Sequence, residues 1–451
     1  MRGLRTTIAL VVVLGGLFAY IYFVTWKQPA EDAGSKQEKV FASLAADKDK
    51  IEELRVASES GETSALKKEK DGWRLVEPVT AAASDTEVSA ITSALSQLEI
   101  VRVIDENPAS LNDYGLSSPR IAIDFRTSGD KELKRLLIGQ KSPTGSNLFA
   151  KRNAEKRVFL IPAFQEPTFN RRPFDLRDKA ALRFDRDKVD RIDIDAGGKV
   201  VEIAKTGSDW NLTKPVQVAS DSAAVEGLIG KVQSTQMKSV VTENATPADL
   251  KKYGLDKPSM TLTVGLGSAK ATLLVGGTAD GTSVYARDAS QPVVMTLENS
   301  LADELRKGAD EYRRKDLFAF RAYDANRIEI TRGGQTMAFD KVKGEGANAE
   351  DKWRRTSPNA ADADKEKMSV LLAKIESLRA SAFVGPGEKT GLDSPVMTVY
   401  AKFDDGKKEE RVKFGKAGNG VYASRAGDSD VARVIPAEFD EILKKLDELA
   451  K

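Results

Sequence analysis

The sequence predicts an α+β protein in which an N-terminal transmembrane helix precedes three homologous repeats. Each repeat is expected to contain an antiparallel β-meander, a helix, further β-strands and a short terminal helix. Three observations lead to this prediction: a charge-free run near the N-terminus, a set of motifs that recurs three times, and strand-like alternation on both sides of a helix-like segment. The 451 residues, 41% of them hydrophobic, provide enough apolar side chains for several cores.

The charge-free run extends from residue 8 to residue 26 and reads IALVVVLGGLFAYIYFVTW. A helix of this length rises about 28 Å, which is enough to cross the hydrocarbon core of a bilayer. Tyr20, Tyr22 and Trp26 lie at its far end, where amphipathic rings favour the headgroup region. A cleaved signal peptide is the alternative, but its apolar core is usually shorter and is followed by small residues suited to cleavage. We therefore expect an uncleaved anchor.

The charges that flank this run predict its orientation. Arg2 and Arg5 precede the run, whereas Lys27 alone follows it directly and is succeeded by acidic residues. By the positive-inside rule, residues 1–7 form a cytoplasmic tail, and the chain beyond the anchor lies outside the cytoplasm. Residues 27–40 are charged, poor in apolar side chains and without periodicity, which predicts a flexible spacer.

Ordered motifs divide the remaining chain into three units. Trp73, Trp210 and Trp353 each precede a proline by five positions. A G-L-x-x-P element follows in each copy, then a run ending in glycine, then an apolar–aromatic–alanine tripeptide. These elements read YGLSSP, YGLDKP and TGLDSP, then LLIG, LLVG and VKFG, then LFAK, VYAR and VYAS. So many motifs at matched spacing indicate a three-fold duplication.

The spacing of these motifs is too long for small solenoid repeats, because successive motif tryptophans lie 137 and then 143 residues apart. Each unit is therefore expected to be a domain with its own core. We place the units at residues 41–178, 179–316 and 317–451.

Alternation of side chains predicts the secondary structure within a unit. The second copy opens with RIDID from Arg191 and the third with RIEIT from Arg327, and Gly-Gly pairs follow both runs, as is typical of an antiparallel meander. The following helix is indicated in the first copy by Ser84 and Glu87, which match a capping box. The terminal helix of the last copy is predicted at residues 439–446.

The composition excludes most catalytic chemistries. The chain has no cysteine and no histidine, so it lacks thiol nucleophiles, disulfides, and the residues that most often bind transition metals and perform acid–base catalysis. The 70 Lys and Arg residues balance 68 Asp and Glu residues, which provides no concentrated basic field for nucleic acid. We expect no catalytic, cofactor-binding or metal-binding residue, no cofactor and no nucleic-acid partner.

Several patterns could carry chemistry, but each has a simpler structural explanation. The motif tryptophans could bind sugars or peptides, although recurrence in every copy favours a shared core position. The stretch GGTADGT from Gly276 resembles a phosphate loop, but it lacks the lysine and recurs as a hairpin turn. Ser64 and Lys67 match the spacing of a Ser–Lys nucleophile pair, but by spacing alone. The acidic run at 185–195 could suggest calcium binding, but it lacks the spacing of a calcium loop. The arginine pairs of RRPFDL and RRKDL recur in the segments that connect successive units, which we call the joints. This recurrence favours salt bridges between neighbouring units.

The anchor, the Trp-x4-Pro strand, the G-L-x-x-P element and the triplication together resemble a bacterial family of membrane-anchored proteins catalogued as domain of unknown function 4340. The resemblance covers roughly residues 40–451. Members of this family are typically encoded beside gliding-motility-type ABC transporters, which implies ABC-type transporter subunits as partners. For a bacterial protein, the predicted orientation implies a single-pass protein of the inner membrane whose bulk faces the periplasm. The resemblance implies no catalytic residue.

These observations predict a non-catalytic, membrane-anchored periplasmic scaffold or accessory protein that works with an ABC-type transporter complex. An envelope protein that binds glycan or peptide through its repeats is the alternative. A carboxylate-only glycosidase is a third interpretation, but it requires two acidic side chains about 5–10 Å apart in one cleft, and no acidic residue stands in an aromatic-rich segment. Three copies of one module multiply surface and reach, which suits association better than catalysis.

Overall fold

The structure is a computed structural model, and it describes residues 38–44, 48–344, 350–385, 387–428 and 430–450. The predicted cytoplasmic tail at 1–7 and the predicted anchor at 8–26 lie outside these ranges. No helix within them is long and apolar enough to cross a bilayer. The chain divides into two compact units, Met1–Lys179 with the first repeat and Ala180–Lys451 with the second and third.

Each repeat contains one nine-stranded antiparallel sheet, and the three sheets share one strand order. In the first repeat this order is β4-β3-β2-β1-β6-β7-β8-β9-β5. The first strand of each repeat therefore lies in the sheet interior, between the second strand and the sixth. The α+β class and the three-fold repetition predicted from the sequence are confirmed.

The strands of the three sheets occupy matching stretches of sequence. The first sheet contains β1 (Ile51–Ala57), β2 (Thr63–Glu69), β3 (Gly72–Glu77), β4 (Ala81–Ala82), β5 (Arg102–Asp105), β6 (Ile121–Thr127), β7 (Lys134–Lys141), β8 (Asn147–Arg152) and β9 (Val158–Pro162). The second contains β10 (Arg191–Ala196), β11 (Lys199–Thr206), β12 (Asp209–Lys214), β13 (Val218–Ala219), β14 (Ser239–Thr242), β15 (Met260–Leu266), β16 (Ala269–Asp280), β17 (Ser283–Asp288) and β18 (Val294–Glu298). The third contains β19 (Ala325–Arg332), β20 (Gln335–Val342), β21 (Lys352–Ser357), β22 (Ala361–Asp362), β23 (Ala382–Phe383), β24 (Met397–Phe403), β25 (Lys408–Ala417), β26 (Gly420–Arg425) and β27 (Ala432–Val434).

The opening hairpins of the second and third repeats use two-residue glycine turns. Gly197 and Gly198 have φ of 63° and 86°, and Gly333 and Gly334 have φ of 55° and 80°. Two successive positive φ angles define the turn whose twist matches that of the flanking strands, and glycine adopts them without steric cost. In the first repeat five residues separate β1 from β2, because Ala57 pairs with Thr63. This longer loop explains why the meander of the first copy is less clear in the sequence.

One helix crosses each sheet directly after its two-residue fourth strand. These helices are α2 (Asp85–Gln97), α5 (Ser222–Ser234) and α8 (Lys365–Glu376). Their N-cap side chains, from Ser84, Asp221 and Asp364, accept backbone N–H bonds from the first turn. The predicted capping box in the first repeat forms only in part, since Ser84 accepts from Glu87 N–H while the Glu87 carboxylate pairs with Arg171 at 2.9 Å.

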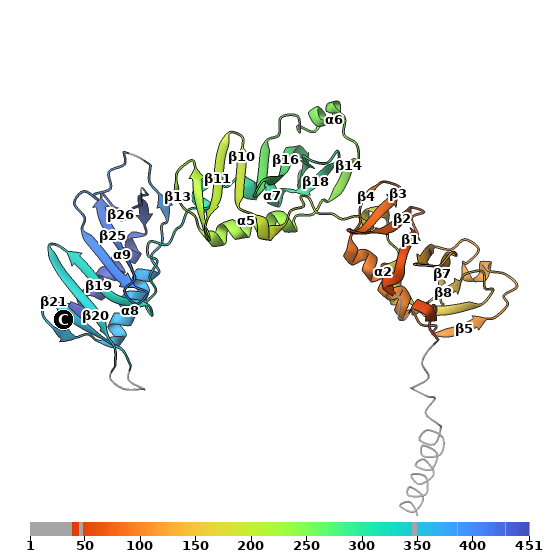
Figure 1. Cartoon of the computed structure of the whole chain (residues 1–451), viewed down its shortest axis with the longest axis horizontal. Helices are drawn as coiled ribbons and strands as arrows, with labels where there is room; N and C mark the ends of the chain where they lie inside the picture. Colours follow the sequence, from red (N-terminus) through yellow and green to blue (C-terminus); the bar gives the residue numbers. More distant parts are fainter. Residues whose placement is uncertain (1–37, 45–47, 345–349, 386, 429, 451) are drawn as a thin grey trace, which may run out of the picture. The chain divides into compact units, whose positions relative to one another are not determined.

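The terminal helices differ most between repeats. The third repeat ends in α9 (Pro436–Ala450), which is longer than the predicted helix at 439–446. The second has the shorter α7 (Asn299–Leu305), and the first has only the single turns α3 (Glu166–Phe169) and α4 (Pro173–Leu176). In Figure 1, α5 and α7 lie against the same side of the second sheet.

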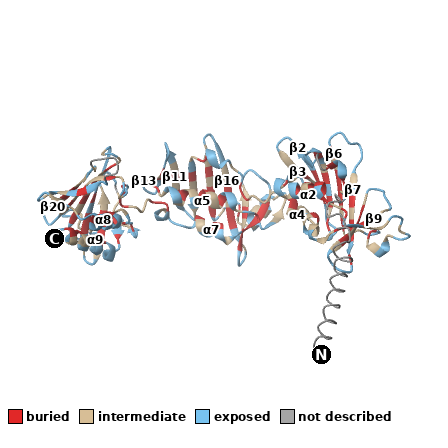
Figure 2. Cartoon of the chain, turned by 90° about the horizontal axis from the view of Figure 1, so that it is seen from below, coloured by how far each residue is buried: buried red, intermediate tan, exposed pale blue. Residues whose placement is uncertain are grey.

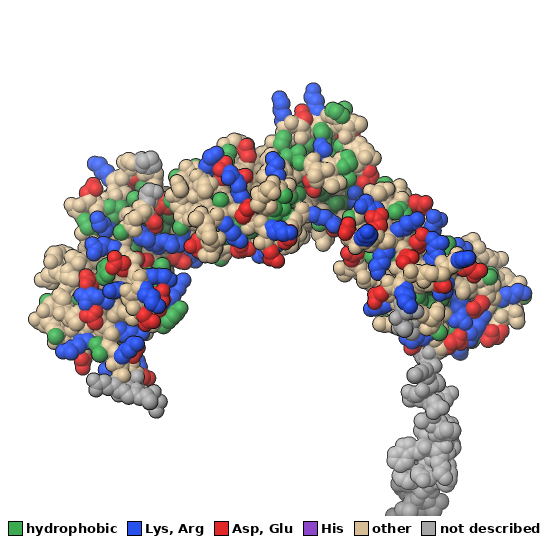
Figure 3. All heavy atoms as spheres, in the orientation of Figure 1, with side chains coloured by type: hydrophobic (Ala, Val, Ile, Leu, Met, Phe, Trp, Pro, Cys, Tyr) green, Lys and Arg blue, Asp and Glu red, His purple; other side chains and the backbone are tan. Residues whose placement is uncertain are grey.

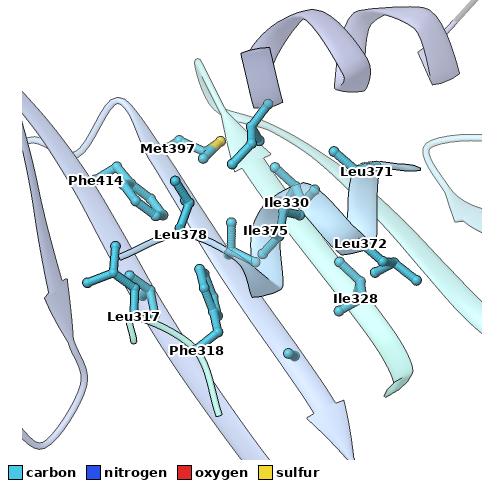
Figure 4. Packing of buried hydrophobic residues seen from close by; sticks show 14 of the residues in the cluster. Leu317, Phe318, Ile328, Ile330, Leu371, Leu372, Ile375, Leu378, Met397 and Phe414 are labelled. Atoms are coloured by element: carbon cyan, nitrogen blue, oxygen red, sulfur yellow. The ribbon is translucent and has the colours of Figure 1, made fainter. Parts of the chain in front are cut away.

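The cores lie between each sheet and its helices. Figure 4 shows Leu371 and Leu372 of α8 beside Ile328 and Ile330 of β19, and all four side chains are buried. Burying such an aliphatic side chain contributes about 1.5–3 kcal/mol. Buried residues follow the strands in Figure 2, and exposed residues gather at the loops. The other face of each sheet carries the polar members of the alternating strands, such as Arg327.

Candidate functional site

The three motif tryptophans occupy equivalent positions but differ in burial. Each is the second residue of its strand, and its carbonyl oxygen accepts a hydrogen bond from the residue ten positions later. Trp210 and Trp353 are 2% and 8% exposed, whereas Trp73 is only partly buried against the first core. The proline that follows each one is preceded by a cis peptide bond. The rings therefore belong to the cores and do not line a shared exposed groove.

Trp210 has the most extensive polar contacts of the three. Its indole N–H donates to Glu226 of α5 at 3.1 Å, and the Lys205 ammonium lies 4.8 Å from its ring centre. Glu226 also pairs with Arg186 at 3.1 Å. The hydrogen bond from Trp210 is the main factor that lowers the pKa of the Glu226 carboxyl. This tryptophan therefore joins the helix to the sheet through both packing and polar contacts.

The two motif glycines of each repeat contact each other. We call this contact the glycine crossing; its three pairs are Gly115 with Gly139, Gly254 with Gly276, and Gly391 with Gly415. The first glycine of each pair has φ between 66° and 70°. A Cβ on the second glycine would overlap the carbonyl oxygen of the residue before the first, which is Tyr114, Tyr253 or Thr390. Only glycine therefore allows the two backbone segments to approach this closely.

The glycine crossing corrects one prediction. Gly276 was expected in a hairpin turn, together with the other glycines of GGTADGT, but it lies inside β16, and the turn comes later, at residues 281–282. Gly139 and Gly415 likewise lie inside β7 and β25. A glycine-rich composition is typical of turns, but here glycine is required for close approach within a strand. The phosphate-loop interpretation is excluded by the same geometry, since no helix follows this strand to bind an anion.

The residue before the first glycine of the crossing makes different side-chain contacts in different repeats. Tyr114 contacts Phe149 with ring centres 5.1 Å apart in the first repeat, and Tyr253 contacts Tyr285 at 4.5 Å in the second. In the third repeat the place of the first ring is taken by threonine, and the Tyr422 hydroxyl instead donates to Glu388 at 3.1 Å. The module is therefore constant in its backbone contact and variable in the neighbouring side-chain contacts.

The open face of each sheet carries a cluster of ion pairs around its first strand. Figure 3 shows acidic and basic side chains interspersed over the visible surface. The pairs are Glu53 with Arg126 and Lys67 in the first repeat, Arg191 with Asp193 and Glu202 in the second, and Arg327 with Glu329 and Asp340 in the third. Because these charges are neutralised within each sheet, the open faces provide no field of one sign.

The acidic run at 185–195 serves local structure. Asp185 caps a short 3₁₀ turn, Asp190 accepts from Gly267 N–H at 2.9 Å, and Asp195 accepts from Gly198 N–H at 2.8 Å. Across the described ranges no group of acidic residues is arranged to hold a metal ion. These carboxylates therefore stabilise turns.

Ser64 and Lys67 do not form a nucleophile pair. Ser64 is fully buried on the core side of β2, and its hydroxyl has no hydrogen-bond partner among the residues that the structure describes. The Lys67 amine is exposed and pairs with Glu53 at 3.6 Å. Residues three apart on a strand point to opposite faces, so the spacing cannot bring the two groups together.

The joints after the first and second repeats make equivalent backbone hydrogen bonds. After the terminal turns, a short extended segment pairs with the outer edge of the fourth strand; we call residues 176–178 and 312–314 the joint strands. In the first repeat, Ser84 N–H donates to the Leu176 carbonyl and Asp178 N–H to the Ala82 carbonyl, both at 2.9 Å. In the second, Asp221 N–H donates to the Tyr312 carbonyl at 2.8 Å and Arg314 N–H to the Ala219 carbonyl at 3.0 Å. Each joint strand therefore covers an otherwise exposed sheet edge.

The arginines of RRKDL and RRPFDL form ion pairs. Arg313 is 9% exposed; it contacts Asp310 at 2.9 Å, pairs with Asp430 of the third repeat, and lies 3.8 Å from the ring centre of Phe383. Arg314 also reaches the third repeat, at Asp428. In the first unit, Arg171 and Arg172 pair with Glu87 and Asp175. The predicted salt bridges between repeats are therefore present at the second joint.

The chain just after that joint is bound by a buried carboxylate, that of Glu410 in β25. Both Glu410 oxygens accept from Ala319 N–H at 2.9 Å, and one also accepts from Phe320 N–H at 2.9 Å. Burial is the dominant influence and raises the pKa of Glu410, although these hydrogen bonds oppose it. The geometry assigns Glu410 a structural role, which is to hold the chain that enters the third repeat.

Comparisons with solved structures find only distant likeness. A DNA polymerase sliding clamp from Pseudomonas aeruginosa, solved with a ligand, is 9% identical over 89% of this chain and 95% of that chain, with a TM-score of 0.15. The DNA polymerase III subunit beta from the same organism is 10% identical over 70% of this chain and 86% of that chain, with a TM-score of 0.14. Likeness this weak supports no conclusion. No curated protein matches the chain.

A comparison with protein families is more informative. The family described as Domain of unknown function (DUF4340) matches residues 73–211, 210–395 and 353–451. The three matches begin at the three motif tryptophans and together extend over most of the chain. The chain therefore belongs to the DUF4340 family.

Proposed function

We propose that this protein is a non-catalytic scaffold or accessory protein, anchored once in the bacterial inner membrane, that assembles with the subunits of an ABC-type transporter from the periplasmic side. One observation carries the proposal: the same module occurs three times with constant internal contacts and different surface chemistry. The recurring residues are those that build the module, namely the motif tryptophans and the glycine crossing. The residue before the first glycine of the crossing is Tyr114 or Tyr253 in the first two copies and Thr390 in the third.

A recurring framework that carries different side chains suits association with several protein surfaces. Three different surfaces on one chain allow contacts to form in succession, and each later contact is intramolecular and gains from the high effective concentration. The ion pair from the buried Arg313 to the partly buried Asp430 supports the same proposal, because it links two successive modules through side chains as well as through the chain. A membrane anchor at residues 8–26 would confine this protein and a transporter to the same two-dimensional layer.

An envelope protein that binds glycan or peptide is the second candidate, and one observation favours it. Tyr253 and Tyr285 lie at the surface of the second repeat as a half-buried pair, with the Lys252 ammonium 5.1 Å from the Tyr253 ring centre. Partly exposed rings with a polar end suit mixed ligands such as sugars and peptides. In this case Tyr253→Ala would abolish binding of the envelope ligand, whereas a scaffold would retain its transporter partners.

Membrane topology tests the placement on which the proposal depends. An alkaline phosphatase reporter fused after residue 451 should be active, because the arginines at positions 2 and 5 retain the N-terminus in the cytoplasm. A β-galactosidase fusion at the same position should be inactive, since that enzyme requires the cytoplasm. Moving the basic residues from the N-terminal side of the run to its C-terminal side provides the control and should reduce phosphatase activity. Strong β-galactosidase activity of the unmodified fusion would contradict the proposed location.

A further inference from the structure

The edge that the joint strands cover in the first two repeats is open in the third. Asp362 and Asp364 are the third-repeat equivalents of Ala219 and Asp221. The residue between them, Ala363 in the third repeat and Ser220 in the second, donates its N–H to the carbonyl oxygen of the motif tryptophan in both repeats. In the second repeat the Ala219 carbonyl and the Asp221 N–H bond the joint strand. Among the residues that the structure describes, no backbone group bonds the Asp362 carbonyl or the Asp364 N–H on this outer edge.

A pocket of about 240 Å³ lies at this open edge. Its apolar part is formed by Phe339 and Leu449, which are 1% and 9% exposed. Its polar part contains Arg355, Asp362, Asp364, Lys367 and Glu448, and two alanines of the edge complete the lining. The pocket therefore combines an unpaired strand edge with a buried apolar surface, which are the two features that strand addition requires.

The first two repeats show which residues such an edge accepts. The residue that bonds the N-cap amide is large, apolar and buried: Leu176 is fully buried and Tyr312 is 1% exposed. An arginine follows each of them, and Arg177 and Arg313 are 8% and 9% exposed. The same two-residue pattern therefore occupies the equivalent edge twice.

Charge at the open edge fits the same pattern. The pocket is lined by three acidic residues, Asp362, Asp364 and Glu448, and two basic ones, Arg355 and Lys367. At the equivalent edge of the second repeat, Arg379 of the third repeat lies 3.4 Å from Asp221, the equivalent of Asp364. An arginine after the apolar residue would therefore meet a lining with an excess of one acidic side chain.

We propose that the outer edge of β22 binds an extended segment of a partner protein, which adds as an antiparallel strand and carries a large apolar residue followed by arginine. The apolar side chain enters the pocket beside Phe339 and Leu449, and its backbone carbonyl accepts from Asp364 N–H. The amide two residues later donates to the Asp362 carbonyl. This inference deepens the scaffold function proposed above and rests on it, since it names the edge through which a partner is held.

Peptide binding to the full chain in detergent tests the proposal. The probe is a fluorescent peptide with the sequence of residues 309–317, ADEYRRKDL, which comes from the second joint. Asp364→Pro removes the N–H, and the observed φ of −60° at Asp364 already suits the proline ring. Asp364→Ala is the matched control, because it removes the same capping carboxylate but keeps the N–H. We expect Asp364→Ala to bind nearly as well as the unmodified protein and Asp364→Pro to bind at least about tenfold more weakly.

Hydrogen exchange on the unmodified protein provides a measurement that does not depend on the folding of a variant. The peptide should slow exchange of the Asp364 amide, and a peptide with Tyr and the adjacent Arg replaced by Ser should not. Equal binding to the two variants, unchanged exchange at Asp364, or no binding to the unmodified protein would each overturn the proposal. Peptide binding at this edge without a transporter subunit among the protein's partners would refute the proposed scaffold function while supporting the edge site.

Discussion

Replacing Gly276 by alanine is expected to destabilise the second repeat by about 3 kcal/mol or more. The added methyl group would overlap the Tyr253 carbonyl oxygen and lie 3.1 Å from Leu255 Cγ and 3.2 Å from the Gly254 carbonyl carbon. Two of these three atoms are backbone atoms, one from Tyr253 and one from Gly254, where the G-L-x-x-P element begins. The overlap therefore cannot be relieved by a side-chain rotation, and β16 must move away from that element.

Gly281→Ala is the matched control for this substitution. Gly281 lies five residues later in the same repeat, has no positive φ, and has no atom within 4 Å of the position that a Cβ would take. Hydrogen exchange of the β16 amides during urea unfolding is the appropriate measurement, because a chain of several domains need not unfold in one step. Equal protection in the two variants would show that the glycine crossing does not require glycine.

Truncating Trp210 to alanine is expected to cost the second repeat about 3–5 kcal/mol. The indole is 2% exposed, and its loss would also leave Glu226 without the N–H that it accepts. Trp73→Ala in the first repeat should cost clearly less, because that ring is only partly buried. Local unfolding free energies from hydrogen exchange of the respective third strands, β12 and β3, provide the comparison. A larger loss from Trp73→Ala would contradict the packing described for the two repeats.

The three-fold repetition could be predicted because each motif depends on a strict steric requirement. A tryptophan of the third strand fills a place under the helix, and the motif glycines allow a backbone contact, so these residue types recur at nearly fixed spacing. The contact between the two glycines could not be predicted, because spacing along the chain does not reveal which segments cross. For this reason the sequence predicts a hairpin turn from Gly276, because a glycine-rich composition is typical of turns and the spacing does not show the contact that requires glycine.

The terminal helices were less predictable than the sheets. The first repeat was expected to end in a short helix, but its terminal segment forms only the single turns α3 and α4, and each of these begins with a proline at its first or second position. In the third repeat the helix begins at Pro436, three residues before the predicted start. Proline favours the first turn of a helix, so it marks a start more reliably than apolar periodicity does.

The candidate binding edge could not be predicted from the sequence. Asp362 and Asp364 look like solvated acidic residues, and their side chains are not what defines the site. The site is defined by backbone groups that are paired in the second repeat and open in the third. Comparison of equivalent edges across the repeats reveals this difference, and the sequence indicates only that the joint segments RRPFDL and RRKDL resemble each other.

Copurification after in vivo crosslinking tests the central claim most directly. Three forms would be compared at equal abundance: the unmodified chain, a chain with residues 8–26 replaced by an unrelated transmembrane helix, and an exported form without an anchor. The scaffold proposal predicts that ABC-type transporter subunits copurify with the first two forms and are strongly depleted from the third, because tethering supplies the effective concentration. Absence of transporter subunits from the unmodified chain, or equal recovery with the anchorless form, would contradict the proposal.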